Sequence, residues 1–151
     1  MISTLRTLFI GQSRRAEEQL QDHYAIELIA QKIRESEDGL RAAKATLASL
    51  IQRQRSEARQ IDGLKQRIDT MTDRAKAALE ADKDTLAQEA AQAIAVMENE
   101  LTIRRETQDR LDEKVTRLRA KIEATHRRIV DLKQGEISAR AVRKEAQMAK
   151  R

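Results

Sequence analysis

The stretch LEADKDTL, residues 79–86, decides the fold of this 151-residue chain, because a regular pattern of apolar residues breaks within it. Apolar residues recur at the a and d positions of a heptad from Ile26 to Ala78. Counting on in sevens would place Asp82 and Glu89 on the apolar seam, where charged side chains are unfavourable. The two sides of the stretch therefore belong to different heptad registers.

Each register is long enough to predict a coiled coil, since three or four heptads suffice. Within each register the seam positions alternate between a and d. Those of the first register are Ile26, Ile29, Ile33, Ser36, Leu40, Ala43, Leu47, Leu50, Gln54, Glu57, Ile61, Leu64, Ile68, Met71, Ala75 and Ala78. Those of the second are Ala87, Ala90, Ile94, Met97, Leu101, Arg104, Gln108, Leu111, Val115, Leu118, Ile122, Thr125, Ile129 and Leu132.

The break between the registers predicts a tight turn between two antiparallel helices. It holds three acidic residues and neither Gly nor Pro. Asp82, Asp84 and Thr85 can each cap the start of a new helix, and Thr85 with Gln88 has the spacing of a capping box. The alternative is one continuous helix with a stutter in its heptads.

A hairpin folded at the centre of the stretch pairs residues whose numbers sum to 165. Ile68 then meets Met97, and Leu64 meets Leu101. The polar seam positions also gather in one patch, which can fix the register of the two helices, with Glu57 opposite Gln108. The members of this patch are Gln54, Glu57, Arg104 and Gln108.

Composition agrees with long helices and argues against an enzyme. Charged residues make up 36% of the chain and aromatic residues 1%, and there is no Pro, Trp or Cys. Such a chain is typical of coiled coils, and a two-helix structure offers no enclosed pocket for catalysis. His23 and His126 lie far apart, and there is no phosphate-binding loop or nucleophile motif. We therefore expect no catalytic residues, no metal site and no cofactor.

The first fifteen residues, MISTLRTLFIGQSRR, predict a short amphipathic helix that binds an anionic membrane. They contain three arginines and no acidic residue, and their apolar residues other than Ile10 share one face of a helix. The alternative is that this leader packs on its own hairpin or on a neighbouring chain. The residues expected to insert are Ile2, Leu5, Leu8 and Phe9, and those expected to contact phosphate are Arg6, Arg14 and Arg15.

Charge is distributed unevenly along the chain. Residues 1–15 carry +3 and residues 140–151 carry +4, which leaves −2 for the rest of a chain of net charge +5. A hairpin would bring both basic segments to one end, facing an anionic surface, and place an acidic turn at the other. Nucleic acid is a weaker candidate than a membrane, because the chain has no stacking aromatics or groove-reading motif.

Several apolar residues fall off the seam and predict contacts between neighbouring chains. A monomeric hairpin would expose them to water, and so many along one pair of helices suggest lateral self-assembly. They are Leu28, Ile51, Val96, Ile103, Val130 and Ile137.

Residues 27–147 resemble the phage-shock-protein A family, which includes the vesicle-inducing protein of plastids. The likeness lies in three runs: ELIAQKIRESEDGLRAAKATLASLIQRQR from Glu27, DRAKAALEADKDTLAQEAAQAI from Asp73, and KIEATHRRIVDLKQGEISARAVRKEAQ from Lys121. Leu86 and Ala87 match the pair that opens the second helix in the family. The resemblance implies a peripheral protein that polymerises and remodels stressed membranes, and, for some members, restraint of an AAA+ transcription activator.

Together these observations predict an all-α protein: a long antiparallel coiled-coil hairpin with a short N-terminal amphipathic helix. Residues 1–22 are expected to form the membrane-binding helix and a hinge. Residues 23–151 are expected to form the hairpin, with arms over 25–79 and 86–148 and a turn over 80–85.

The predicted function is a peripheral, self-assembling coiled coil in bacterial membrane-stress response and membrane maintenance. The resemblance implies a cytoplasmic location on the inner face of the bacterial plasma membrane. The alternative is a soluble coiled-coil adaptor that binds and inhibits an AAA+ transcription activator without acting on lipid.

Overall fold

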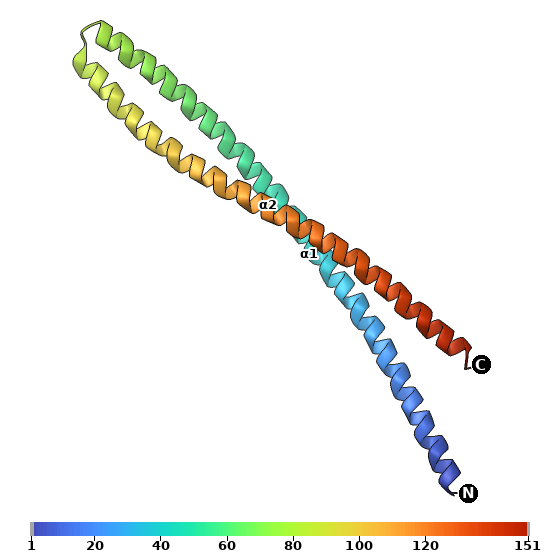
Figure 1. Ribbon diagram of the computed structural model, residues 1–151. Coiled ribbons are helices and arrows are strands. Elements are labelled where there is room, and N and C mark those ends of the chain that lie inside the picture. The colour runs from blue at the N-terminus through green and yellow to red at the C-terminus, as the bar shows by residue number, and fades with distance from the viewer. Residues whose placement is uncertain (1, 151) are drawn as a thin grey trace. The chain divides into compact units, whose positions relative to one another are not determined.

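The computed structural model describes the backbone of residues 2–150 and the side chains of residues 14–150. This part of the chain forms two long helices and no strand (Figure 1). Helix α1 spans Ile2–Glu80, and helix α2 spans Asp84–Met148. The all-helical class and the break between two helices are thus confirmed, and the alternative of one continuous helix is wrong.

The helix ends at the turn lie within two residues of the predicted ones. The second helix begins two residues before the expected start of the second arm. The predicted division at residue 22 coincides with no helix end, because α1 is continuous through it. A separate leader helix with a hinge therefore stays a prediction.

The turn after α1 is built on one residue in the left-handed backbone conformation. Asp82 has a φ of 54°. The N–H of Asp82 donates to the carbonyl of Leu79 at 3.1 Å, and that of Lys83 donates to the carbonyl of Ala78 at 2.8 Å. This pair of bonds is a Schellman motif, which satisfies the carbonyls left free at a helix end. Asp82 therefore ends α1 and does not cap α2.

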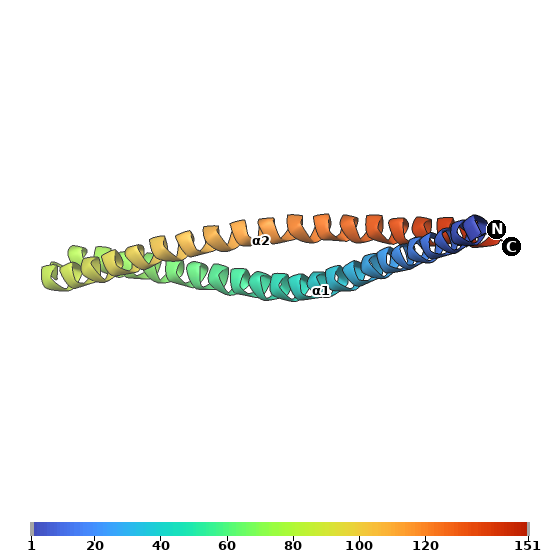
Figure 2. The ribbon, with the colours of Figure 1, turned by 90° about the horizontal axis from the view of Figure 1, so that it is seen from below.

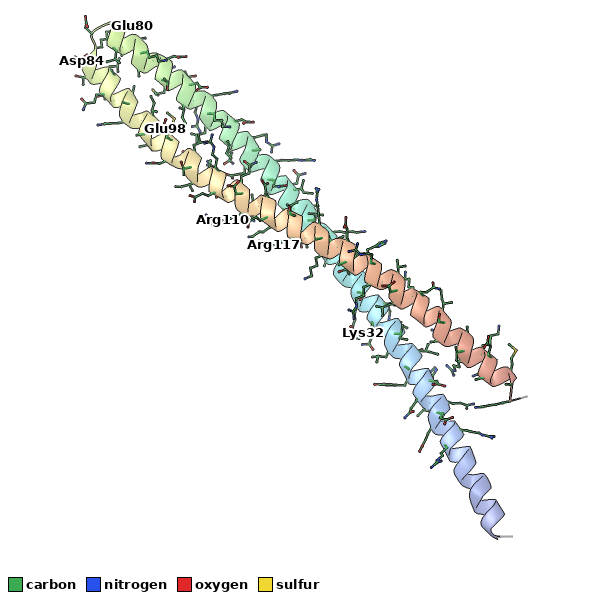
Figure 3. The ribbon with its side chains drawn as sticks, in the orientation of Figure 1. Lys32, Glu80, Asp84, Glu98, Arg110 and Arg117 are labelled. Carbon is green, nitrogen blue, oxygen red and sulfur yellow. The ribbon has the colours of Figure 1, made fainter. Side chains whose placement is uncertain are left out.

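Helix α2 begins without the predicted Thr85 cap. The N–H of Ala87 donates to the carbonyl of Lys83 at 3.0 Å, which makes Lys83 the N-cap residue and leaves Thr85 inside the helix. Asp84 lies in the first turn of α2, where a negative charge interacts favourably with the helix dipole. Figure 3 labels Glu80 and Asp84, the two acids that flank the turn.

The chain divides into two compact units, each containing part of both helices. The turn unit comprises Lys44–Ala120, and the terminal unit comprises Met1–Ala43 together with Lys121–Arg151. In the turn unit, α1 and α2 run in opposite directions away from the turn, and Figure 2 shows the same two segments after a 90° rotation.

The core of the turn unit is a small apolar cluster between the two helices. Leu64 is fully buried and packs with Ile61 and Leu101. Ile68 and Met97 pack against this cluster while half-buried. The cluster contains both of the predicted pairs, as expected for residues whose numbers sum to 165. Truncation of Leu64 to alanine typically costs about 2–5 kcal/mol at such a site.

A polar patch lies beside this cluster, and its contacts are centred on Arg104. Arg104 makes ion pairs with Glu57 at 3.1 Å and Glu100 at 3.0 Å, and it also bonds Gln60. Arg104, which the heptad count places in a layer next to that of Glu57, is thus the residue that pairs with Glu57. The hydrogen bonds to Glu100 and Glu57 raise the pKa of Arg104, so its guanidinium stays charged.

The terminal unit has a seam of its own and one ion pair between its helices. Ile26, Ile33 and Ile129 are buried there. Lys133 Nζ lies 2.6 Å from Glu37 Oε1, and this contact lowers the pKa of Glu37. Because that pKa is lowered, the stabilisation by the pair is present at neutral pH and is lost as the pH falls through the acid range.

The two predicted registers coincide with the observed burial. Every seam position of both registers is buried or half-buried. All buried apolar residues among the described side chains are seam residues: Ile26, Ile33, Leu40, Ile61, Leu64, Ala78, Ala87, Leu101, Leu111, Val115 and Ile129. The outer faces carry charge, with i,i+4 pairs such as Arg110–Glu106 and Arg117–Glu113 on α2 (Figure 3).

We expect Asp82→Gly to stabilise the protein by up to about 1 kcal/mol, because glycine adopts a positive φ without the steric cost of a Cβ atom. Asp84→Gly is the matched control, since it places glycine inside a helix and should destabilise by about 1 kcal/mol. Urea unfolding followed by far-UV circular dichroism measures both. Destabilisation by Asp82→Gly would contradict the role given to this backbone conformation.

We expect Arg104→Leu to lower the Tm, because it leaves the Glu57 side chain, only 16% exposed, without its cation. The double variant Glu57→Leu/Arg104→Leu removes both charges and extends the apolar seam. It should melt at or above the wild-type Tm in a thermal scan. A double variant that melts below Arg104→Leu would show that the polar patch contributes more stability than apolar packing does.

Candidate functional site

The candidate site is the end of the terminal unit where the apolar seam stops. We call it the basic end and define it as residues 14–25 of α1 with residues 138–150 of α2. Every α1 side chain from residue 14 to residue 25 is exposed, and Ile26 is the first to be buried. Counting the heptad back from Ile26 puts Gln19 and Asp22 on the seam, so the sequence offers no apolar residue to bury there.

Polar contacts replace apolar ones between the two helices of the basic end. Continuing the heptad of α2 beyond Leu132 reaches Glu136, Ala139 and Arg143, all of which are half-buried. Arg143 Nη1 lies 2.9 Å from His23 Nδ1. A guanidinium can only donate, so this ring nitrogen accepts the hydrogen bond.

Cations gather at the basic end, and they differ in how far they are neutralised. Arg140 makes an ion pair with Glu136 at 2.8 Å. Among the described side chains, Arg14, Arg15, Lys144 and Lys150 have no anionic partner, and all four are exposed. Four exposed cations without an ion-pair partner thus lie where the seam has ended, together with the acidic residues Glu17, Glu18 and Asp22 of α1.

Exposed apolar side chains lie beside these cations. Leu20 is 75% exposed and Tyr24 is 73% exposed, and with Leu28 they recur every four residues on α1. That spacing places them in one stripe along the helix. Of these three residues, only Leu28 was predicted from the sequence. Leu20 and Tyr24 lie before the first buried seam residue, and their i, i+4 spacing is the sequence signal that identifies them.

The predicted membrane-binding residues divide into two groups. Arg14 and Arg15 are exposed on α1 at the basic end. The side chains of the others lie outside the part of the chain that the structure describes: Ile2, Leu5, Arg6, Leu8 and Phe9. The backbone of those residues belongs to α1 and is helical.

The predicted self-assembly residues are mostly, but not all, exposed. Leu28, Val96, Ile103, Val130 and Ile137 are between 48% and 68% exposed. Ile51 is half-buried, so its expected exposure is wrong. It follows the seam residue Leu50 in α1 and lies at the e position of its heptad, where a long side chain partly covers the seam.

The described residues offer no metal site. They contain no group of three or more His, Cys, Asp or Glu side chains that could hold a metal ion.

The groove beside the turn is lined largely by alanines together with Met71 and Leu86. In the part of the chain that the structure describes, neither helix has an apolar stretch long enough to cross a bilayer.

Comparison with known proteins gives one match. A model of the PspA/IM30 family matches residues 2–151, which is nearly the whole chain. No curated protein and no solved structure matches the chain. The family match covers both helices, the turn and the basic end, and it agrees with the resemblance carried by the turn sequence. The chain therefore belongs to the PspA/IM30 family, whose general role lies in membrane stress and membrane remodelling.

Proposed function

We propose that this protein is a peripheral membrane-binding, self-assembling coiled coil that acts in bacterial membrane-stress response and membrane maintenance. It works by binding and not by catalysis, without a cofactor, on the inner face of the plasma membrane. The leader, residues 1–15, is the anchor: its apolar face enters the acyl boundary and its arginines contact lipid phosphate.

The observation that carries this proposal is the exposed stretch that continues from the leader. Residues 1–15 contain three bases and no acid, and the side chains of residues 14–25 are all exposed on the same helix. The leader thus adjoins a segment that buries nothing against α2 within the described residues. A basic, amphipathic segment of this kind is attracted to anionic headgroups and inserts its apolar face. Membership of the PspA/IM30 family supports the same role.

Self-assembly is the second element of the proposal. The burial pattern supports an antiparallel coiled coil whose seam is already filled within one chain. Apolar residues that remain exposed on α2, such as Val96 at 68% and Ile103 at 62%, are then available to a neighbouring copy. Burying such side chains between chains gains free energy from the same hydrophobic effect that forms the seam.

Vesicle co-sedimentation tests the anchor. We expect the intact chain to sediment with vesicles containing phosphatidylglycerol and to remain in solution with pure phosphatidylcholine. Phe9→Asp should weaken binding about tenfold or more, because inserting a phenylalanine gains about 1.5–3 kcal/mol. Phe9→Leu is the control and should bind nearly as well as wild type.

Two results would contradict the proposal. The intact chain could stay in the supernatant with every vesicle, or Phe9→Asp could bind as tightly as wild type. Either result would favour the soluble adaptor, which binds an AAA+ transcription activator without lipid.

A further inference from the structure

A shallow groove at the basic end lies between the two helices and is lined by cations and amides. Its walls come from one residue of α1 and from the last turns of α2, and its volume is about 370 Å³. The lining residues are Gln19, Lys144, Gln147, Met148 and Lys150. They include two ammonium groups and two carboxamides and no carboxylate, so the groove presents hydrogen-bond donors and positive charge.

The two lysines of the groove make no ion pair among the described side chains. Three acidic residues, Glu17, Glu18 and Asp22, occur nearby on α1, but none of them lines the groove. Arg140 and Arg143, the preceding cations of α2, are occupied by Glu136 and His23. Lys144 has no anionic partner among the described side chains, and neither has Lys150. Glu145 follows Lys144 directly, but consecutive residues of a helix point about 100° apart, and it does not line the groove.

The chemistry of the lining selects a phosphate-bearing ligand. Lysine ammonium groups bind phosphate oxygens as point charges, and carboxamide N–H groups add neutral donors. The volume is in the range of small-ligand sites and accommodates one headgroup. Met148, which is 60% exposed, adds an apolar surface to a site that is otherwise polar.

We propose that this groove binds the headgroup of an anionic phospholipid, as a second membrane contact separate from the leader. The proposal rests on the proposed function. Gln19 lies one helical turn after Arg15 on the continuous helix α1, so the groove adjoins the segment that carries the leader. The exposed Leu20 and Tyr24 follow on α1 and add apolar surface at the same end. A bilayer that receives the leader thus presents its headgroups near the groove.

A second contact changes how the protein holds a membrane. Once the leader has inserted, the headgroups near the groove are at high effective concentration, so even weak binding there strengthens attachment. The same contact makes attachment depend on anionic lipid and on ionic strength. The leader supplies mainly apolar insertion, and the groove supplies mainly electrostatic attraction.

The test compares two charge reversals of equal size in the full chain. Lys144→Glu/Lys150→Glu removes the groove cations. Arg127→Glu/Arg128→Glu is the matched control, because these residues are exposed on the same helix and in the same unit, without an anionic partner among the described side chains. Circular dichroism checks that both variants remain helical. Binding is measured by co-sedimentation with phosphatidylglycerol–phosphatidylethanolamine vesicles.

We expect the groove variant to bind about tenfold more weakly than wild type and the control about twofold more weakly or less, because cations act strongly only close to the headgroups. Lys144→Arg/Lys150→Arg should restore binding. The Phe9→Asp variant should keep some salt-sensitive binding to the vesicles. That residual binding should disappear when Lys144→Glu and Lys150→Glu are added to Phe9→Asp. Equal weakening by the groove variant and the control would overturn the proposal, since it would reflect net charge alone.

Other outcomes separate the alternatives. If wild type binds no vesicle, the proposed function itself fails. If wild type binds and Lys144→Glu/Lys150→Glu binds equally well, only the groove proposal fails. Wild type could bind inorganic phosphate saturably, and the groove variant could lose that binding while it still binds vesicles. That result would assign the groove to a free anion. If the groove variant instead loses binding to duplex DNA but still binds vesicles, the groove would be assigned to nucleic acid. Either result would overturn the lipid assignment.

Discussion

Burial of the a and d side chains between α1 and α2 is the interaction on which the rest of the structure depends. The chain has two aromatic residues and no cysteine, so aliphatic side chains form its core and no disulfide cross-links it. Every buried apolar residue among the described side chains belongs to this seam. The outer faces are left to charged residues, whose i,i+4 pairs add a few tenths of a kcal/mol each.

The two places where the seam stops determine what else the molecule offers. At the turn, a Schellman motif ends α1, and two acids flank the connection. At the basic end, most positions that would continue the seam are polar, and the helices meet there through Arg143 and His23. The exposed cations and the apolar stripe of α1 lie at that same end. The exposed cations and apolar residues of the basic end are thus a direct consequence of where the heptad pattern ends.

The heptad pattern predicted the fold well because burial on a helix depends on spacing alone. It identified every seam position, the break at residues 79–86 and the pairing of Leu64 with Leu101. Details that depend on local backbone geometry were not predictable in this way. Asp82, Asp84 and Thr85 could each act as a cap, and only the backbone showed that Asp82 is the residue with a positive φ.

The candidate site was only partly predictable. Leader residues and basic segments are visible in the sequence because charge and amphipathic spacing are local properties. The ion pair between Arg104 and Glu57 depends on how two side chains from different helices are oriented, and heptad spacing does not determine that. The partial burial of Ile51 arises at an e position, which the count of a and d residues leaves out. The lysine groove needs Gln19 of α1 beside the last turns of α2, and that juxtaposition exists only in three dimensions.

The continuity of α1 has a mechanical consequence for the terminal unit. A helix without a break transmits rotation about its own axis, because each residue is held to the next turn by backbone hydrogen bonds. When the first turns of α1 settle on a surface, the angle at which they settle therefore fixes the angle of Leu20, Tyr24 and Ile26 as well. A rotation of the first turns of α1 about the helix axis would therefore also rotate Ile26, the first residue of α1 that packs in the seam with α2.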